Sequence, residues 1–261
     1  MRRELTIRHT TLTALPDSVW QETSLEILNV SNNKLTVIAD AIRNLQQVRI
    51  LDVGHNALRD LPPAIGELGG LTDYLYLSDN ALTELPSSIG KLTRVRYLNA
   101  GDNQLARLPA SIGDMVGLVE LRLSGNKLAS IPASIGQLTR LRELHLAKND
   151  LFEVPDTIGE LTGLRRLSLE ANRLAQLPAS IGKLTELTEL TLRGNKINML
   201  PDSLAELKQL TWLDARANGI TSLPPWLADL PLQKLDLRWN PVASYPAWVE
   251  DLEAKGCVVF R

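Results

Sequence analysis

Apolar positions recur along the chain with a period of about 23 residues, and the pattern is the same in almost every period. In residues 118–140, the segment from Leu118 to Leu123 alternates apolar and polar residues, which predicts a strand with one buried face. Ile135 and Leu138 then point inward from a short helical turn on the opposite side. A fixed period of this length predicts a solenoid of stacked units with parallel strands, not a globular core around a single pocket. Because the helical side is wider than the strand side, we expect the stack to curve with its strands on the inner surface.

An asparagine follows the predicted strand in ten successive units, at intervals of 22 to 24 residues. A turn at this point directs backbone N–H and C=O groups into the interior, where each unmet polar group costs about 1–3 kcal/mol. A carboxamide both donates and accepts hydrogen bonds, so a column of asparagines can bond to the turns above and below it. We therefore predict a structural ladder, and Thr10 occupies the same phase one unit earlier, which makes about eleven units. The ladder residues are Asn33, Asn56, Asn80, Asn103, Asn126, Asn149, Asn172, Asn195, Asn218 and Asn240.

A proline stands six residues after the ladder position in all but one unit, where Ala39 replaces it. Its fixed φ sets the exit of the chain from the turn. The resulting consensus, LxxLxLxxNxLxxLPxxIGxLxxL, resembles the leucine-rich-repeat family from about Leu5 to Leu252. The variant is similar to the 23-residue repeats of intracellular and bacterial members, such as plant intracellular Ras-group-related proteins and the scaffold proteins of Ras signalling. The resemblance implies an α/β solenoid, a right-handed horseshoe with a concave parallel sheet, short helical turns on the convex side, and protein binding on the concave face. It implies no catalytic residue.

The two ends of the array differ in sequence. We expect residues 1–244 to form the repeat array and residues 245–261 to form the remainder and a C-terminal cap. The cap should contain a short helix in residues 245–252 and a last extended segment in residues 257–260. At the N-terminal end, the first predicted strand has no comparable cover. That edge should be marginally ordered or pair with a second copy, so we expect a monomer or a weak dimer.

Three positions of each strand point away from the core, namely the sixth, fourth and second residues before the ladder asparagine. Neighbouring strands lie about 4.8 Å apart, so eleven strands give an arc of roughly 50 Å, which suits a macromolecule better than a metabolite. Bulky uncharged side chains gather at these positions in four neighbouring units: Ile27, Ile50, Tyr74, Tyr76 and Tyr97. Tyrosine-rich patches are favoured at interfaces because they bury much area at a low entropy cost. We interpret this group as the first candidate surface for a protein partner; aromatic packing across strands without a partner is the alternative.

The same region carries the one extra residue of the array, within Gly69–Tyr74. A bulge or a widened loop would absorb it, and such irregularities are over-represented near functional sites. Neutral drift in a loop is the alternative explanation. Because the extra residue coincides with the tyrosines, this region is our first choice for the contact with a protein partner.

A second candidate surface lies toward the C-terminal end, where three consecutive units carry arginine at the second position before the asparagine. These residues, with the tryptophan beside them, are Arg193, Arg216, Arg238 and Trp212. Arginine and tryptophan are the residues most enriched at the energetic centres of interfaces. A ladder of ion pairs with Asp214 and Asp236 is the alternative interpretation.

Composition and charge narrow the function further. The formal net charge is -2, which favours neither nucleic acid nor an acidic membrane as a partner, and no apolar run is long enough to cross a bilayer. Cys257 is the only cysteine, so no intramolecular disulfide can form and a reducing compartment fits. Ser168 and His145 are column neighbours, but the spacing of the strands exceeds hydrogen-bond reach. We therefore predict no enzyme, no metal and no cofactor.

These observations favour a non-enzymatic scaffold that binds another protein on its strand surface, in the cytoplasm or inside a host cell as a delivered effector. One alternative is a recognition or regulatory module of a larger signalling or effector protein. Another is a consensus-like repeat protein without a natural ligand. The sequence offers no means of identifying the partner.

Overall fold

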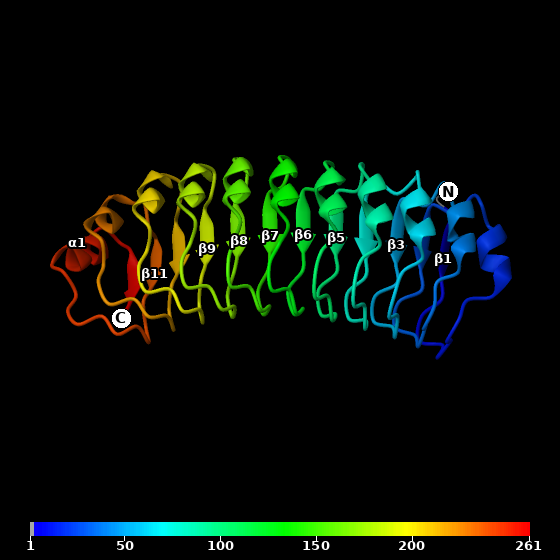
Figure 1. Cartoon of the computed structure of the whole chain (residues 1–261), viewed down its shortest axis with the longest axis horizontal. Coiled ribbons are helices and arrows are strands. Elements are labelled where there is room, and N and C mark those ends of the chain that lie inside the picture. Colours follow the sequence, from blue (N-terminus) through cyan, green and yellow to red (C-terminus); the bar gives the residue numbers. More distant parts are fainter. Residues whose placement is uncertain (1–2) are drawn as a thin grey trace. The chain divides into compact units, whose positions relative to one another are not determined.

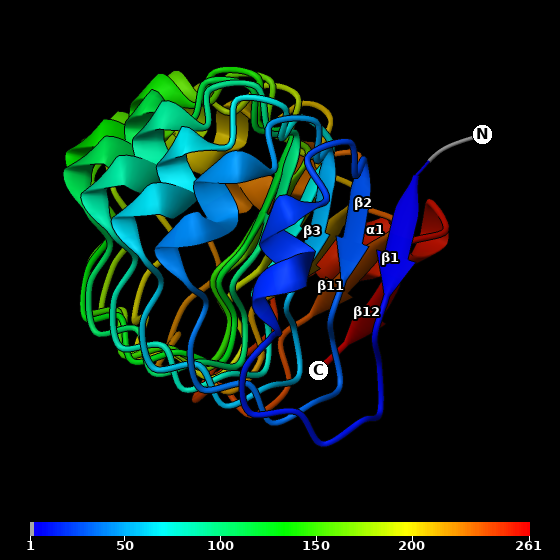
Figure 2. The same cartoon turned by 90° about the vertical axis from the view of Figure 1, so that its right-hand side faces the viewer.

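The computed structural model describes residues 3–261, which form two compact units, the first ending at Leu128 and the second beginning at Ala129. Each unit repeats one element pair, a strand of three residues and a 3-10 helix of five residues, in sequence order (Figure 1). Within the first unit the helical turns lie on one side and the strands on the other (Figure 2). Among residues 3–261, no helix combines the length and the apolar character needed to cross a bilayer.

The first unit contains six parallel strands that pair in chain order from β1 to β6. Equivalent positions of successive repeats face each other, so Leu5 lies opposite Leu28, and Leu28 lies opposite Leu51. The elements are β1 (Glu4–Thr6), η1 (Asp17–Gln21), β2 (Ile27–Asn29), η2 (Asp40–Asn44), β3 (Ile50–Asp52), η3 (Pro63–Glu67), β4 (Tyr74–Tyr76), η4 (Ser87–Lys91), β5 (Tyr97–Asn99), η5 (Ala110–Asp114) and β6 (Glu120–Arg122).

The second unit continues the same alternation with parallel strands. Its elements are η6 (Ala133–Gln137), β7 (Glu143–His145), η7 (Asp156–Glu160), β8 (Arg166–Ser168), η8 (Ala179–Lys183), β9 (Glu189–Thr191), η9 (Asp202–Glu206), β10 (Trp212–Asp214), η10 (Pro225–Asp229), β11 (Lys234–Asp236), α1 (Trp248–Ala254) and β12 (Val258–Phe260). The predicted terminal helix and extended segment are confirmed, although α1 begins at Trp248. The solenoid with parallel strands on one side and helical turns on the other is confirmed within each unit.

The asparagine ladder is present, and Asn103 shows its geometry. Its side-chain oxygen accepts the N–H of Leu82 at 3.0 Å, and its amide nitrogen donates to the carbonyls of Leu77 at 3.0 Å and Ala100 at 3.2 Å. Leu77 and Leu82 belong to the preceding repeat and Ala100 to the same turn, so one side chain links two repeats. The first link is to Thr10, whose N–H and hydroxyl both donate to Asn33. The same pair of links, to the repeat before and to the residue's own turn, is made by Asn33, Asn56, Asn80, Asn126, Asn172, Asn195, Asn218 and Asn240.

The residue directly before each ladder position adopts a left-handed backbone in all eleven repeats, with φ between 51° and 71°. Only two of these residues, Gly125 and Gly194, are glycines. Side chains other than glycine adopt this conformation at a cost, and asparagine and aspartate do so most readily. The regularity therefore comes from the hydrogen-bonded turn that the ladder holds, and the sequence pattern alone does not reveal it.

The glycine that follows isoleucine in most of the 3-10 helices is required by the close approach of neighbouring helices. A Cβ atom added at Gly159 would lie 2.6 Å from the carbonyl oxygen of Ser180 in the next repeat. We expect Gly159→Ala to lower the free energy of unfolding by about 1–3 kcal/mol, because backbone atoms would have to move apart. Gly219→Ala is the matched control, since its nearest neighbour there lies at 3.5 Å. Urea unfolding should separate the two variants; equal stabilities would contradict the close-packing explanation.

Candidate functional site

Three tyrosines form one cluster on the outward surface of β4 and β5, the strand face of the first unit. Parallel pairing puts Tyr74 opposite Tyr97, and Tyr76 lies two residues along the same strand as Tyr74. The ring centroids of Tyr74 and Tyr76 are 5.8 Å apart in a stacked arrangement, and Tyr97 lies 5.5 Å from Tyr74 and 5.2 Å from Tyr76. Tyr74 is 42% exposed. The predicted grouping of these residues, here called the tyrosine cluster, is therefore present.

Two phenols of the tyrosine cluster, those of Tyr76 and Tyr97, have a raised pKa. Burial raises the pKa of Tyr76, and the neighbouring Tyr74 and Asp52 raise it further. Burial also raises the pKa of Tyr97, although the Arg122 guanidinium opposes this shift. That guanidinium lies 5.8 Å from the Tyr97 ring centroid, within the range of a cation–π interaction. The cluster thus offers aromatic surface together with hydroxyl groups that can donate and accept hydrogen bonds.

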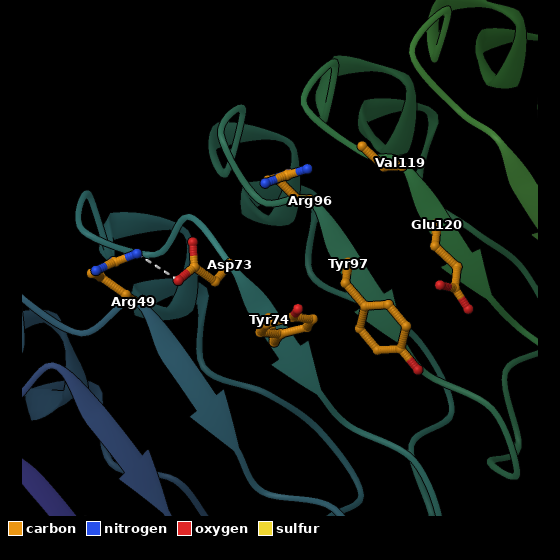
Figure 3. A pocket seen from close by; sticks show the side chains of 7 residues that line it. All are labelled: Arg49, Asp73, Tyr74, Arg96, Tyr97, Val119 and Glu120. Atoms are coloured by element: carbon orange, nitrogen blue, oxygen red, sulfur yellow. Dashed lines mark hydrogen bonds and ion pairs between the residues drawn. The ribbon is translucent and has the colours of Figure 1, made fainter. Parts of the chain in front are cut away.

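A hollow of about 360 Å³ lies between the tyrosine cluster and the edge at which the strands begin (Figure 3). Tyr74 and Tyr97 form one side of it, and Arg49, Asp73 and Arg96 stand along the other. Arg49 and Asp73 form an ion pair at 2.7 Å. Arg49 and Arg96 were not predicted from the sequence because they lie outside the three outward positions of each strand, whereas Asp73 belongs to the predicted insertion. They stand one residue before the first of those positions, where the alternation of arginine, aspartate and arginine in neighbouring repeats is the available signal.

The extra residue of the array is accommodated immediately before β4, where Thr72 and Asp73 occupy the place of one residue in other repeats. In the regular repeat that follows, the Arg96 carbonyl accepts both N–H groups of residues 119 and 120. At the insertion, Thr72 accepts from Arg96 and Asp73 accepts separately from Tyr97. The bulge or widened loop predicted from the sequence is therefore present. Its residue Asp73 provides the carboxylate that pairs with Arg49.

The two isoleucines of the first candidate surface extend the tyrosine cluster along neighbouring strands. Ile27 on β2 lies opposite Ile50 on β3, and Ile50 lies opposite Tyr74. Both isoleucines are half-buried. The five residues predicted as the first surface are thus contiguous on the strand face.

Two of the three arginines of the second candidate surface, Arg216 and Arg238, are engaged in ion pairs within the second unit. Arg216 contacts both oxygens of Asp214, at 2.8 to 3.1 Å, and also approaches Asp236 at 3.6 Å. Arg238 pairs with Asp236 at 2.7 Å. The carboxylate side chains are only 3% exposed. The Arg–Asp ladder considered from the sequence is therefore present, although most of its pairs join residues two apart on one strand.

The remaining residues of this surface are arranged around aromatic rings. The Lys234 ammonium lies 4.6 Å from the Trp212 ring, and the Arg238 guanidinium lies 4.8 Å from the ring of Phe260 on β12. Arg193 is exposed and lies outside the ion pairs found among residues 3–261. Phe260 was not predicted as part of this surface because it belongs to the terminal strand β12 and not to a repeat. Its proximity to Arg238 depends on the pairing of β12 with β11.

The buried carboxylate of Asp236 should make stability sensitive to acid. Burial alone would raise its pKa, but hydrogen bonds and charge from Arg238, with a smaller effect of Arg216, hold the pKa below its usual value. A depressed pKa contributes stability above the unfolded value of about 3.9, and the contribution is lost as the pH falls through the folded pKa. Urea unfolding between neutral pH and about pH 2 should therefore show a shallower acid loss for Asp236→Asn than for the native chain. Parallel curves would show that the ion pair contributes nothing.

Sequence-family comparison matches two descriptions to this chain. "Leucine-rich repeat region" covers residues 36–151, 87–172 and 155–254, and "Leucine rich repeat" covers residues 3–58. No curated protein is similar enough to the chain to count as a match.

Solved structures with the same fold come from several sources. A leucine-rich-repeat protein of Leptospira interrogans is 26% identical with a TM-score of 0.51, over 100% of this chain and 96% of that one. A chain from the octameric complex of Latrophilin 3, Unc5D and FLRT2 has a TM-score of 0.81 at 24% identity, over 98% of this chain and 82% of that one. The ectodomain of the Arabidopsis thaliana receptor kinase GASSHO1/SCHENGEN3, in complex with CASPARIAN STRIP INTEGRITY FACTOR 2, is 26% identical with a TM-score of 0.58. It aligns with 91% of this chain, which spans 36% of the ectodomain chain.

Proposed function

The chain belongs to the leucine-rich-repeat family, whose repeats typically form a protein-binding module and usually have no catalytic activity, and from this premise we propose that it is a non-enzymatic scaffold. It binds another protein through the strand face of its first unit. The tyrosine cluster supplies the main contact, Ile27 and Ile50 extend it, and the second surface around Trp212 and Arg193 is subordinate.

The exposed tyrosine cluster is the observation that carries this proposal. Three aromatic rings meet on a face where most neighbouring side chains are polar, and Tyr74 is 42% exposed. Large rigid aromatic side chains bury much area in a complex and lose little rotamer freedom. The hollow beside them adds the charged groups of Arg49, Asp73 and Arg96, which can fix the orientation of a partner. The Arabidopsis ectodomain, a leucine-rich repeat that is 26% identical to this chain, was solved in complex with CASPARIAN STRIP INTEGRITY FACTOR 2, which supports a binding role for these repeats.

Crosslinking from one position of the strand face tests the proposal. A photoreactive amino acid at Tyr74 should capture a discrete partner in the native cell, because that side chain stands at the centre of the proposed contact. The matched position is Lys91, which is exposed on η4 of the same repeat but on the helical side. We expect the adduct from position 74 only.

The same adduct must also depend on the rest of the tyrosine cluster. Tyr97→Ala should reduce its yield at least about tenfold, the loss expected when a central aromatic contact is truncated. Gln104→Ala, an exposed substitution outside the strand face, should leave the yield unchanged. Equal adducts from positions 74 and 91, or an adduct insensitive to Tyr97→Ala, would refute the tyrosine cluster as the contact.

A recognition module of a larger protein is the second candidate function. The alignment with the receptor-kinase ectodomain favours it, because this chain spans only 36% of that chain. An open reading frame that continues beyond either end of this sequence in the genome would support this function. The proposed location is a reducing compartment, the cytoplasm or the interior of a host cell, to which the single buried Cys257 is suited.

A further inference from the structure

The first strand leaves an open edge. β1 pairs only with β2 among the residues that the structure describes, and it stands at one end of the strand order (Figure 2). In β2, Ile27 donates its N–H to the carbonyl of Arg3 and Asn29 accepts the N–H of Ile7. The backbone N–H and C=O groups of these two β2 residues therefore point toward β1, away from β3. By register, their counterparts in β1 are Glu4 and Thr6. The backbone groups of Glu4 and Thr6 consequently point toward the open edge, where a further strand could bond to them.

The end of the apolar core is open at the same place. Leu5 and Ile7 are half-buried, whereas the residues one repeat later, Leu28 and Val30, are 0% exposed. An open hollow of about 520 Å³ adjoins the strand, with Leu5, Ile7 and Leu25 among its lining residues. Within residues 3–261, both the backbone edge and the apolar end thus lack the cover that the later repeats of the first unit receive from the repeat before them.

We propose that a second copy of this chain covers this edge, with the two β1 strands paired antiparallel about a two-fold axis through Thr6. A two-fold axis makes identical edge strands antiparallel. Residues that exchange both backbone hydrogen bonds then lie directly opposite each other. Only edge-facing residues can do so, and these alternate along the strand as Glu4, Thr6 and Arg8.

Charge favours one register among those that this alternation allows. An axis through Leu5 or Ile7, in a pair that is not hydrogen-bonded, places Thr6 opposite Glu4 or opposite Arg8, so neither forms a Glu4–Arg8 pair. An axis through Glu4 would oppose two carboxylates, and an axis through Arg8 would oppose two guanidinium groups, both of which are destabilising. An axis through Thr6 opposes the two Thr6 residues and places Glu4 of each copy opposite Arg8 of the other. All three side chains are exposed, and the Arg8 side chain makes no ion pair within residues 3–261.

The inward side chains agree with the same register. An axis through Thr6 places Leu5 of one copy opposite Ile7 of the other, because both flank Thr6. Residues directly opposite in an antiparallel pair point to the same side of the sheet, so these apolar side chains would continue the core across the axis. The segment Glu4-Leu5-Thr6-Ile7-Arg8 is therefore self-complementary in backbone groups, charge and apolar surface.

Sedimentation velocity on the whole chain, over about a hundredfold range of concentration, tests the pairing by mass action. The native chain should show a concentration-dependent dimer. Glu4→Arg and Arg8→Glu should each weaken it by about tenfold or more, because either change turns two attractive pairs into two repulsive ones. Circular dichroism should show that both variants remain folded. Glu186→Arg, an exposed charge reversal in the second unit, should leave the dimer unchanged.

Mixing the two variants distinguishes this register from every other contact. A Glu4→Arg chain carries two positive side chains at the edge and an Arg8→Glu chain carries two negative ones, so the mixture should restore a dimer that neither variant forms alone. The double swap within one chain should also dimerise. A native chain that stays monomeric throughout, a dimer indifferent to Glu4→Arg, or a mixture that remains monomeric would each overturn the proposal.

Discussion

Replacing Asn103 with leucine is expected to lower the free energy of unfolding by about 3–5 kcal/mol, one of the two largest effects we anticipate. The side chain is 8% exposed, and the substitution removes every one of its hydrogen bonds. The N–H of Leu82 would then lie inside the protein without a partner. The carbonyls of Leu77 and Ala100 would each lose one of two bonds and keep the other, from the amides of Asn80 and Asn126. The unmet N–H costs about 1–3 kcal/mol and each further lost hydrogen bond about 0.5–1.5 kcal/mol, and relaxation of the turn recovers part of the sum.

Gln104→Leu is the matched control for this change. It removes a carboxamide of the same chemistry from the next residue, but Gln104 is exposed and its amide serves no buried turn. Its effect should stay within about 0.5 kcal/mol. Urea unfolding of both variants, followed by circular dichroism, measures the difference. Equal stabilities would show that the ladder is incidental to the fold.

Arg216→Met is expected to cost about 2–3 kcal/mol at neutral pH. The substitution keeps much of the apolar stem and removes the cation that contacts both oxygens of Asp214. That carboxylate is 3% exposed, so it cannot recover the lost partner from water. Part of the penalty for breaking a fully buried pair is avoided, because the end of Arg216 is itself 22% exposed.

Arg193→Met provides the comparison, since Arg193 occupies the same position of an earlier repeat and is exposed. Its loss should leave the stability within about 0.5 kcal/mol of the native value. Denaturant unfolding of both variants at neutral pH measures the difference, and equal stabilities would contradict the electrostatic explanation.

The sequence predicts the repeat architecture well because its determinants are local and periodic. Leucine and asparagine return at fixed intervals, and stacking in register then places Tyr74 beside Tyr97 with no further information. The left-handed residue of each turn escapes prediction because seven residue types, including Lys148 and Trp239, occupy that position. The need for Gly159 also escapes, because the close contact is with the next repeat.

The candidate site is less predictable because its details depend on where side chains turn. Arg216 and Asp214 are two apart on a strand and share one face, so the sequence allows either an ion pair or two independent contact residues. The structure shows the pair. The charged rim of the tyrosine hollow lies outside the regular outward positions, and one of its residues, Asp73, belongs to the insertion. Site residues that lie outside the repeat pattern can be predicted only if an insertion in the repeat is itself taken to indicate a functional site.

The way each ladder asparagine reaches back to the preceding turn constrains how such a gene can change in length. Duplication or deletion of one whole repeat leaves every remaining turn with an amide, so recombination between repeats preserves the fold. A single residue gained between Leu77 and Leu82 would separate Asn80 or Asn103 from its partners. The one extra residue in this chain lies instead just before β4, outside those turns, where an insertion leaves the hydrogen bonds of the ladder intact.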